Sequence, residues 1–200
     1  MSRETPLLLA SSSPRRKRLL RKINLPFRSF SSGLEENMGK GRPKFHVCVL
    51  AGKKARSILH RSKGNWVLGA DTVVVLDGLI LGKPSDSEAA RSMLLRLSGK
   101  EHKVVTGYCL LDPAGREAHT EAIVTRVKMK SLTEEEIQGY IESGEPFGKA
   151  GSYAIQGLGS FMVERISGSY TNVVGLPLCA LVTALLALGA LRGFPFVSAD

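Results

Sequence analysis

An acidic residue, Asp71, and a basic residue, Lys83, lie at the open end of a predicted β-hairpin. Residues 67–76 and 79–81 are largely apolar and rich in β-branched side chains, and Asp77-Gly78 between them is a strong two-residue turn signal. A hairpin of this length would return Lys83 to the neighbourhood of Asp71. A lone aspartate in a Gly-x-Asp pattern more often caps a turn, but an acid and a base together beside a buried hairpin favour a chemical site.

A second candidate site is the run SSSPRR at residues 11–16. We expect a short apolar strand over residues 6–10 and a helix over residues 15–23, with Ser13 as N-cap and Pro14 at the first helical position. Arg15 and Arg16 in the first turn oppose the helix macrodipole. They suit an anion, because backbone N–H groups and guanidinium groups would converge on it. A solvated basic helix face is the alternative, and the residues alone leave both open.

The excess of basic charge lies in the N-terminal third of the chain. Residues 1–63 hold 16 Lys or Arg against 3 Asp or Glu, a net charge of +13, whereas the whole chain carries +10. This asymmetry predicts an anionic partner, which could be a nucleic acid, a membrane surface or a phosphate ester. Nucleic acid is the less favoured choice, because aromatic residues make up only 6% of the chain and no nucleic-acid-binding motif is present.

Composition predicts one globular domain with reduced thiols. The chain has 200 residues, of which 43% are hydrophobic and 23% charged. Its 3 cysteines have no C-x-x-C spacing, which favours a cytoplasmic location, and its 4 histidines lack metal-ligand spacing. No secretory signal is expected. The uncharged run over residues 173–191 is broken by Gly175 and Pro177, so it predicts a buried helix over residues 178–188, which is too short to cross a membrane.

The remaining elements follow from hydrophobic periodicity and turn residues. Further strands are expected over residues 25–32, 104–111, 122–130 and 161–163. Further helices are expected over residues 47–60 and after two capping boxes that begin at Ser85 and Thr133. Loops or turns are expected over residues 37–46, 148–159 and 167–172. This mixture predicts an α/β (mixed α+β) domain with a mixed sheet.

Eight motifs stand in the order and at the spacing expected for Maf proteins, which are nucleoside triphosphate pyrophosphatases. They are SSSPRR, GLEE, LAGKKA, GADTVVV, LGKP, LSGKEHKVVT, KAGSYAIQG and GSYTNVVGLP. The chain therefore resembles this family over about residues 7–188. The resemblance implies a single Maf-like domain over residues 1–200 with a Maf/ITPase-like fold. In that fold a central twisted mixed sheet is flanked by helices, and an active-site cleft lies between two lobes.

The resemblance also implies an activity. A Maf protein hydrolyses a nucleoside triphosphate between the α- and β-phosphates, and it uses a divalent metal cation such as Mg²⁺, with Mn²⁺ or Co²⁺ as alternatives. The form YAIQG resembles the branch that acts on dTTP and UTP, whereas a branch acting on methylated guanine nucleotides usually has Ser-Glu in place of Ile-Gln. The implied protein is a cytoplasmic house-cleaning enzyme whose partners are its nucleotide substrate and, as a homodimer, a second copy.

Residue roles carry over motif by motif. Asp71 corresponds to the family's proton acceptor and, together with Glu36, to its metal ligands. The positions that bind or select the substrate are Ser13, Arg15, Arg16, Lys54, Thr72, Lys83, Lys149 and Gln156. Several cations suit a triphosphate, and two carboxylates suit magnesium. Whether Asp71 acts as a base or holds the metal stays open. The amide of Gln156 could read the edge of a pyrimidine.

Two glycines depart from the family pattern. Gly52 stands where an arginine is usual, behind a segment rich in glycine, proline and lysine, which predicts a shorter or less ordered helix around Lys54. Gly148 stands where the family often has aspartate, which predicts reduced or altered activity if that aspartate holds the metal or a lysine. Two other functions are compatible with the sequence. One is a nucleic-acid-binding module, and the other is a nucleotide sensor without turnover.

Overall fold

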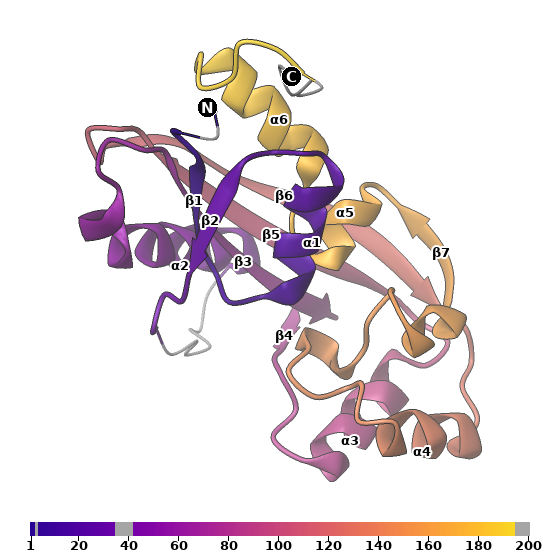
Figure 1. Cartoon of the computed structure of the whole chain (residues 1–200). Helices are drawn as coiled ribbons and strands as arrows, with labels where there is room; N and C mark the ends of the chain where they lie inside the picture. The colour runs from indigo at the N-terminus through magenta and orange to yellow at the C-terminus, as the bar shows by residue number, and fades with distance from the viewer. Residues whose placement is uncertain (3, 35–41, 195–200) are drawn as a thin grey trace. The chain divides into compact units, whose positions relative to one another are not determined.

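The computed structural model describes residues 1–2, 4–34 and 42–194. Within these residues one 7-stranded sheet has the strand order β2-β1-β3-β5-β6-β7, and β4 pairs with β3 (Figure 1). β1 pairs in parallel with β2 and β3, whereas the β3–β4 and β6–β7 pairs are antiparallel. The sheet is therefore mixed, and the α/β class expected from the sequence is confirmed.

The element bounds are as follows. The strands are β1 Leu7–Ala10, β2 Phe27–Phe30, β3 Val67–Leu76, β4 Leu79–Leu81, β5 Glu101–Leu111, β6 Glu117–Met129 and β7 Val163–Ser167. The helices are α1 Pro14–Lys22, α2 Pro43–Ser57, α3 Ser87–Leu97, α4 Glu134–Glu142, α5 Tyr170–Val174 and α6 Leu178–Ala187. Short 3₁₀ turns are η1 Leu59–Arg61, η2 Ala150–Ser152 and η3 Leu158–Met162.

The chain divides into two compact units. Unit 1 comprises residues 1–71, 106–123 and 175–200, and unit 2 comprises residues 72–105 and 124–174. Three strands, β3, β5 and β6, each contribute residues to both units. The organisation as one Maf-like domain with two lobes stays a prediction.

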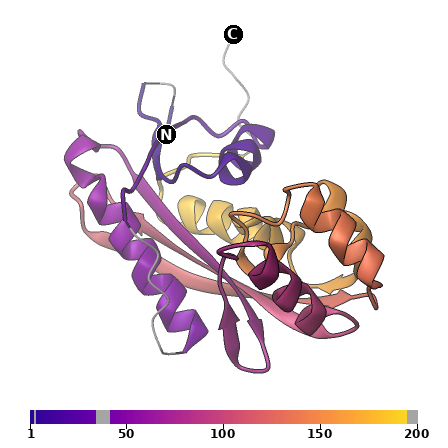
Figure 2. The same cartoon turned by 90° about the horizontal axis from the view of Figure 1, so that it is seen from below.

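In unit 1 the helix α2 lies very close to the sheet. Figure 2 shows α2 on one face of the strands of this unit, with α1 and α6 on the other. A Cβ atom on Gly69 of β3 would lie 2.0 Å from the carbonyl oxygen of Ala51. A Cβ atom on Gly107 of β5 would lie 2.6 Å from the carbonyl carbon of Val47. Only glycine leaves room for a helix backbone at this distance, so the two glycines form the seat on which α2 rests.

The core of unit 1 follows from strand alternation. Leu8 and Ala10 point to the same face of β1, because side chains two apart in a strand share a face. There they pack with Val67 and with Ala51 and Ala55 of α2, all of them buried. This apolar stripe holds α2 on the sheet.

Unit 2 is built around two helices that lie side by side, α3 and α4 (Figures 1 and 2). Leu94 and Leu97 of α3 pack with Ile137 and Ile141 of α4 in one buried cluster. Thr133 and Glu136 form the capping box expected for α4. The capping box expected at Ser85 is wrong. Asp86 is the N-cap of α3, because its carboxylate accepts the N–H of Ala89 at 2.8 Å.

Three local expectations are wrong for identifiable reasons. α2 begins at Pro43 rather than at Val47 and has 15 residues, so the helix that carries Lys54 is not shortened. Proline suits the first turn of a helix, and residues 43–46 are helical although they looked like a loop. Residues 161–162 belong to η3, and β7 begins at Val163. The expected polar turn contains α5, where the buried Asn172 donates to the carbonyl oxygen of Val104 at 3.1 Å.

The hairpin and the C-terminal helix match the sequence-based expectation. Asp77 and Gly78 have positive φ angles of 50° and 81°, as a type I′ turn requires. α6 spans 10 residues and buries Leu181 and Leu185. In the described part of the chain, no helix combines the length and the apolar character needed to cross a bilayer.

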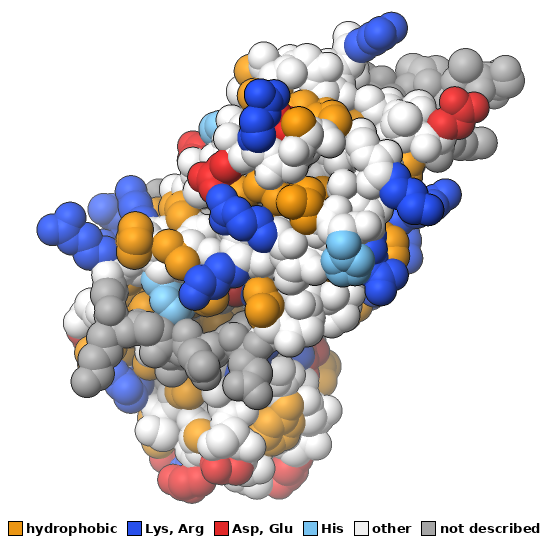
Figure 3. Space-filling view, turned by 90° about the vertical axis from the view of Figure 1, so that its left-hand side faces the viewer, with side chains coloured by type: hydrophobic (Ala, Val, Ile, Leu, Met, Phe, Trp, Pro, Cys, Tyr) orange, Lys and Arg blue, Asp and Glu red, His pale blue; other side chains and the backbone are white. Residues whose placement is uncertain are grey.

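Part of the basic excess is engaged locally in unit 1. The guanidinium of Arg21 lies 5.9 Å from the ring centre of Phe27, and that of Arg61 lies 5.1 Å from the ring centre of Phe30. On the face that Figure 3 shows, lysine and arginine side chains are interspersed with acidic and hydrophobic ones and form no continuous patch. The described residues on this face therefore present no broad basic surface for a nucleic acid.

A buried histidine gives the fold of unit 2 a pH dependence. His102 is 2% exposed, and its Nε2 lies 2.7 Å from the hydroxyl of Tyr153. Burial lowers the pKa of His102 to about 4 from the ordinary 6.5. The unfolded chain would bind a proton near pH 6.5, and the folded chain only near pH 4. The free energy of unfolding should therefore fall by about 3 kcal/mol as the pH decreases from 6.5 to 4. Below pH 4, His102 should cause no further decrease.

This dependence can be measured by chemical denaturation between pH 4 and pH 7.5. A His102→Gln variant keeps a hydrogen-bonding side chain but cannot titrate, so its stability should vary less over this range than that of the parent protein. His60→Gln, at an exposed position, is the matched control. Equal pH dependence in the His102 variant and the parent would contradict the assignment.

Candidate active site

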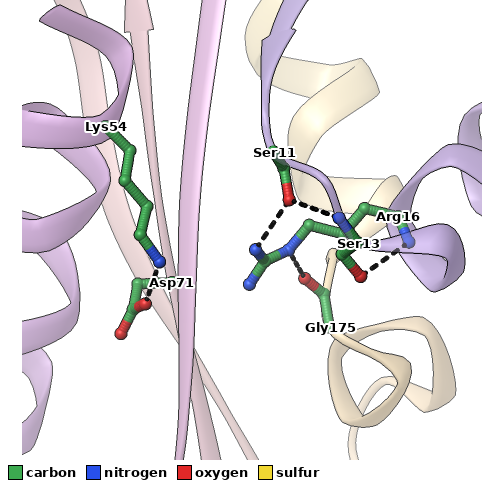
Figure 4. A network of polar contacts seen from close by, with 6 residues as sticks. All are labelled: Ser11, Ser13, Arg16, Lys54, Asp71 and Gly175. Atoms are coloured by element: carbon green, nitrogen blue, oxygen red, sulfur yellow. Dashed lines mark hydrogen bonds and ion pairs between the residues drawn. The ribbon is translucent and has the colours of Figure 1, made fainter. Parts of the chain in front are cut away.

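Asp71 lies inside strand β3 and forms a buried ion pair with Lys54. The Nζ atom of Lys54 is 2.6 Å from Oδ1 of Asp71, and the two side chains are 5% and 6% exposed (Figure 4). Asp71 is thus the fifth residue of a ten-residue strand and not a turn cap. The turn-cap alternative is therefore wrong, and this pair was not foreseen from the sequence.

Strand alternation and the glycine seat explain why these two side chains meet. Val67, Gly69 and Asp71 are two residues apart in β3, so they face the same side, toward α2. The site where a Cβ of Gly69 would sit lies between Ala51 and Ala55 of α2, at 2.0 Å from the oxygen of Ala51 and 2.7 Å from the nitrogen of Ala55. Lys54 belongs to the same helical turn, so the close approach of α2 carries its side chain to the carboxylate.

The pair fixes Asp71 in a chemically useful state. Two charges taken out of water cost several kcal/mol each in desolvation, which a close partner offsets but rarely turns into a net gain. A buried pair of this kind is therefore more informative about function than about stability. Lys54 binds Oδ1, and the second oxygen, Oδ2, points away from it (Figure 4). The carboxylate can thus accept a proton or bind a cation through Oδ2 while Lys54 holds its orientation.

The SSSPRR turn is tied to the C-terminal part of unit 1. Ser13 caps α1, as expected, by accepting the N–H of Arg16 at 3.4 Å. The side chain of Arg16 turns inward: its Nε donates to the carbonyl oxygen of Gly175 at 2.8 Å, and its Nη1 donates to Oγ of Ser11 at 3.3 Å (Figure 4). Ser11 and Gly175 are contacts that sequence reasoning missed.

These contacts change the interpretation of the two arginines. Arg16 is only 9% exposed, so it is not part of a solvated basic face. Its guanidinium braces the turn that precedes α1 against the segment before α6. Arg15 is partly exposed. An anion at this turn stays a prediction.

Unit 2 holds four of the other candidate residues. Thr72 follows Asp71 in β3 and, by alternation, faces the opposite side of the sheet. Lys83 is exposed and lies beyond the β3–β4 ladder, which ends at the Val74–Leu81 pair. Its approach to Asp71 therefore stays a prediction. The N–H of Gly151 donates to the carbonyl oxygen of Gly82 at 2.9 Å, which joins the segment that follows Lys149 to the one that precedes Lys83.

Gln156 and Lys149 lie in a segment that follows α4, residues 148–159, which we call the glycine-dense segment. Gln156 is partly buried, and its Oε1 is buried without a hydrogen-bond partner among the described residues. Buried amide oxygens are almost always paired, so the lack of a partner here is unusual, and the role of Gln156 in reading a base stays a prediction. Nζ of Lys149 donates to the carbonyl oxygen of Glu145. Gly148 has a positive φ of 73°, a conformation that aspartate also tolerates better than most residues.

The described residues can be tested for a metal site. None of them form a group of three or more His, Cys, Asp or Glu side chains that could hold a metal ion. Glu36, expected to be a ligand, lies outside the described residues. Magnesium, however, is commonly held by one or two carboxylates and by substrate phosphates. Asp71, with Oδ2 directed away from Lys54, fits a metal that is bound largely by the substrate.

The chain is similar in sequence to a family of known proteins. The model of the family described as "Maf-like protein" matches residues 6–188. The dTTP/UTP pyrophosphatase of Syntrophotalea carbinolica is 48% identical over 96% of this chain and 88% of its own length. The dTTP/UTP pyrophosphatase of Geotalea uraniireducens is 46% identical over 96% of this chain and 100% of its own length. A solved structure of a nucleoside-triphosphatase, or dITP/XTP pyrophosphatase, from Mycobacterium abscessus aligns with 92% of this chain and 96% of its own, at 17% identity and a TM-score of 0.42.

Proposed function

The chain belongs to the Maf-like protein family, and on that premise we propose that it hydrolyses dTTP and UTP to their monophosphates and pyrophosphate. Relatives that are 46–48% identical over nearly the whole chain carry this activity in their names. The structural observation that best supports the proposal is the buried Lys54–Asp71 pair, which holds a carboxylate in one orientation inside a strand. A nucleotide-metabolising hydrolase needs such a group beside the phosphate that is attacked.

The residues divide the work of the reaction. Oδ2 of Asp71 accepts a proton from the water that attacks the α-phosphorus, and Lys54 holds the carboxylate in its orientation through Oδ1. Arg15, Lys83 and Lys149 neutralise the triphosphate, and the N-terminus of α1, capped by Ser13, presents N–H groups to phosphate oxygens. Asp71 and Glu36 would hold a divalent cation, Mg²⁺ with Mn²⁺ or Co²⁺ as alternatives. Such an ion supplies charge neutralisation at the phosphates and lowers the pKa of a bound water.

Gln156 is proposed to select the base. Its buried Oε1 would accept the N3–H of thymine or uracil, and its amide N–H would donate to the adjacent carbonyl. Cytosine presents an acceptor at N3 and would leave Oε1 unpaired, which is the kind of mismatch that a polar site rejects strongly. Thr72, the residue after Asp71 in β3, is also proposed to contact the substrate.

Replacing Gln156 with leucine should change base preference more than phosphate chemistry. We expect kcat/KM for UTP and dTTP to fall by about 10- to 100-fold, the scale of a lost pair of hydrogen bonds in a closed site, and that for CTP to change little. The ratio of kcat/KM for UTP and CTP is the measurement. Gln138→Leu on the exposed side of α4 is the control. An unchanged ratio in Gln156→Leu would refute the assignment.

The direct test of the activity is a pyrophosphate-release screen. It uses canonical and modified nucleoside triphosphates with Mg²⁺, Mn²⁺, Co²⁺ or chelator. Pyrophosphate and monophosphate from dTTP and UTP with metal are the expected products. Thermal stabilisation by nucleotide without pyrophosphate would favour a sensor. Tight DNA binding that weakens by about 10³–10⁵ between 50 and 200 mM salt, without turnover, would favour a nucleic-acid-binding module.

Two further properties are proposed, a cytoplasmic location and a homodimer. A cytoplasmic location is consistent with Cys48, Cys109 and Cys179, all of which are free thiols. A homodimer stays a prediction that sedimentation or light scattering would test. Disulfide bonds between these cysteines in the isolated protein would count against the proposed location.

A further inference from the structure

The carboxylate of Glu145 accepts hydrogen bonds from backbone N–H groups that follow Gln156 in the chain. Glu145 follows α4, and its Oε2 accepts the N–H of Leu158 at 3.0 Å. Its Oε1 accepts the N–H of Gly159 at 2.9 Å and the hydroxyl of Tyr140 at 3.0 Å. The residues two and three positions after Gln156 are therefore bound to one side chain.

The same arrangement reaches the other side of Gln156. The hydroxyl of Tyr140, which donates to Glu145, accepts the N–H of Ala154 at 3.1 Å. Ala154 lies two residues before Gln156. Tyr140 and Glu145 thus grip the chain on both sides of Gln156, and we call this pair the Tyr140–Glu145 clamp. Glu145 also accepts Nζ of Lys149 on its backbone oxygen, so a second candidate substrate residue is attached to the same point.

Two glycines are shaped around the clamp. A Cβ atom on Gly157 would lie 2.4 Å from Oε2 of Glu145, and the residue has a positive φ of 81°. A Cβ atom on Gly159 would lie 2.7 Å from the hydroxyl of Tyr140. The carboxylate and the hydroxyl therefore sit directly against the backbone of the segment. These close contacts explain the glycines at positions 157 and 159.

The charge state of Glu145 favours the grip. Burial raises the pKa of this carboxyl, but the N–H groups of Gly159 and Leu158 and the hydroxyl of Tyr140 outweigh burial and leave the pKa below its ordinary value. The group is consequently ionised at neutral pH. Hydrogen bonds to an ionised acceptor are shorter and stronger than those between neutral groups, so the clamp holds the backbone more firmly than a neutral side chain would.

We propose that Tyr140 and Glu145 are positioning residues for base selection and act through Gln156. The inference rests on the proposed function and deepens it. The clamp fixes the backbone two residues before and two to three residues after Gln156, whose buried Oε1 has no hydrogen-bond partner in the described parts of the chain. A fixed backbone presents that oxygen in one direction, and a site that reads hydrogen bonds needs placement within about 0.5 Å.

The proposal is tested with Tyr140→Phe, which removes one hydroxyl and keeps the ring that fills the core, and with Glu145→Gln. Each variant should lower the ratio of kcat/KM for UTP to that for CTP by about tenfold, the factor expected for one lost charge-assisted hydrogen bond. KM for UTP should rise, and kcat at saturation should stay within about twofold, because the phosphate chemistry is not touched. Glu142→Gln on the exposed face of α4 is the matched control.

A double-variant cycle distinguishes positioning from a general loss of structure. In a Gln156→Leu background, Tyr140→Phe should have no further effect on the UTP to CTP ratio, because the two residues act in series. Gly157→Ala should lower the ratio as Glu145→Gln does. An unchanged ratio in both single variants, or equal loss of kcat for every nucleotide, would overturn the proposal. Absence of pyrophosphate release by the parent protein would instead overturn the proposed function, and the ratio of UTP to CTP affinities would then test the clamp.

Discussion

Asp71→Asn should lower the turnover of dTTP and UTP by at least about 10²-fold, the scale of a lost general base or metal ligand. The amide keeps the size of the carboxylate, so the change removes charge and proton affinity and little else. Pyrophosphate release under saturating nucleotide is the measurement. Raising the Mg²⁺ concentration distinguishes the two roles, because it should restore part of the rate if Asp71 mainly holds the metal and none if Asp71 mainly accepts a proton.

The control for this substitution lies in the same hairpin. Asp77 occupies the exposed turn with a positive φ of 50°, a conformation that asparagine adopts readily. Asp77→Asn should keep full activity. Turnover of Asp71→Asn close to that of the parent protein would remove Asp71 from the mechanism, and the buried pair would then be a structural feature alone.

Lys54→Met should impair both stability and turnover. Methionine fills most of the volume of the lysine stem, but Asp71 would be left buried and charged without its partner. Breaking a buried pair in this way typically costs about 3–5 kcal/mol in the free energy of unfolding. Turnover should fall by about 10- to 100-fold, because the carboxylate loses the contact that fixes its direction. Denaturant titration and steady-state kinetics measure the two effects.

Two comparisons sharpen this second prediction. Lys53→Met, at the exposed neighbouring position, should change neither property much. The double variant Lys54→Met/Asp71→Asn buries no net charge, so it should recover most of the stability that Lys54→Met loses and remain nearly inactive. Recovery of activity in the double variant would contradict a role for Asp71 in the reaction.

The sequence predicted those parts of the fold that depend on neighbouring residues. The type I′ turn at Asp77-Gly78, the capping box at Thr133 and the N-cap at Ser13 are each decided within a few residues, and all three are present. The predicted start of α2 was wrong because the glycine, proline and lysine residues before Val47 suggested a loop. The packing of its apolar stripe against the sheet outweighs that local composition.

For the candidate site, the sequence could name residues but could not indicate how their side chains lie. Motif resemblance pointed to Asp71 and Lys54 independently, but their ion pair depends on two glycines in strands. The contact between Arg16 and Gly175 joins residues 159 positions apart, and no local pattern indicates it. Glu145 was passed over for a similar reason: its partners are backbone N–H groups of a segment that looked like a plain loop.

The seat formed by Gly69 and Gly107 has a consequence for how this protein can vary over evolution. The distance between Lys54 and Asp71 depends on the absence of a Cβ atom at Gly69 and Gly107, because this absence lets α2 lie close to the sheet. The outward side of α2, which carries Lys53, has no such constraint and is open to drift. The two small positions beneath it are closed to drift. One added carbon atom there would separate an acid from its base without altering either.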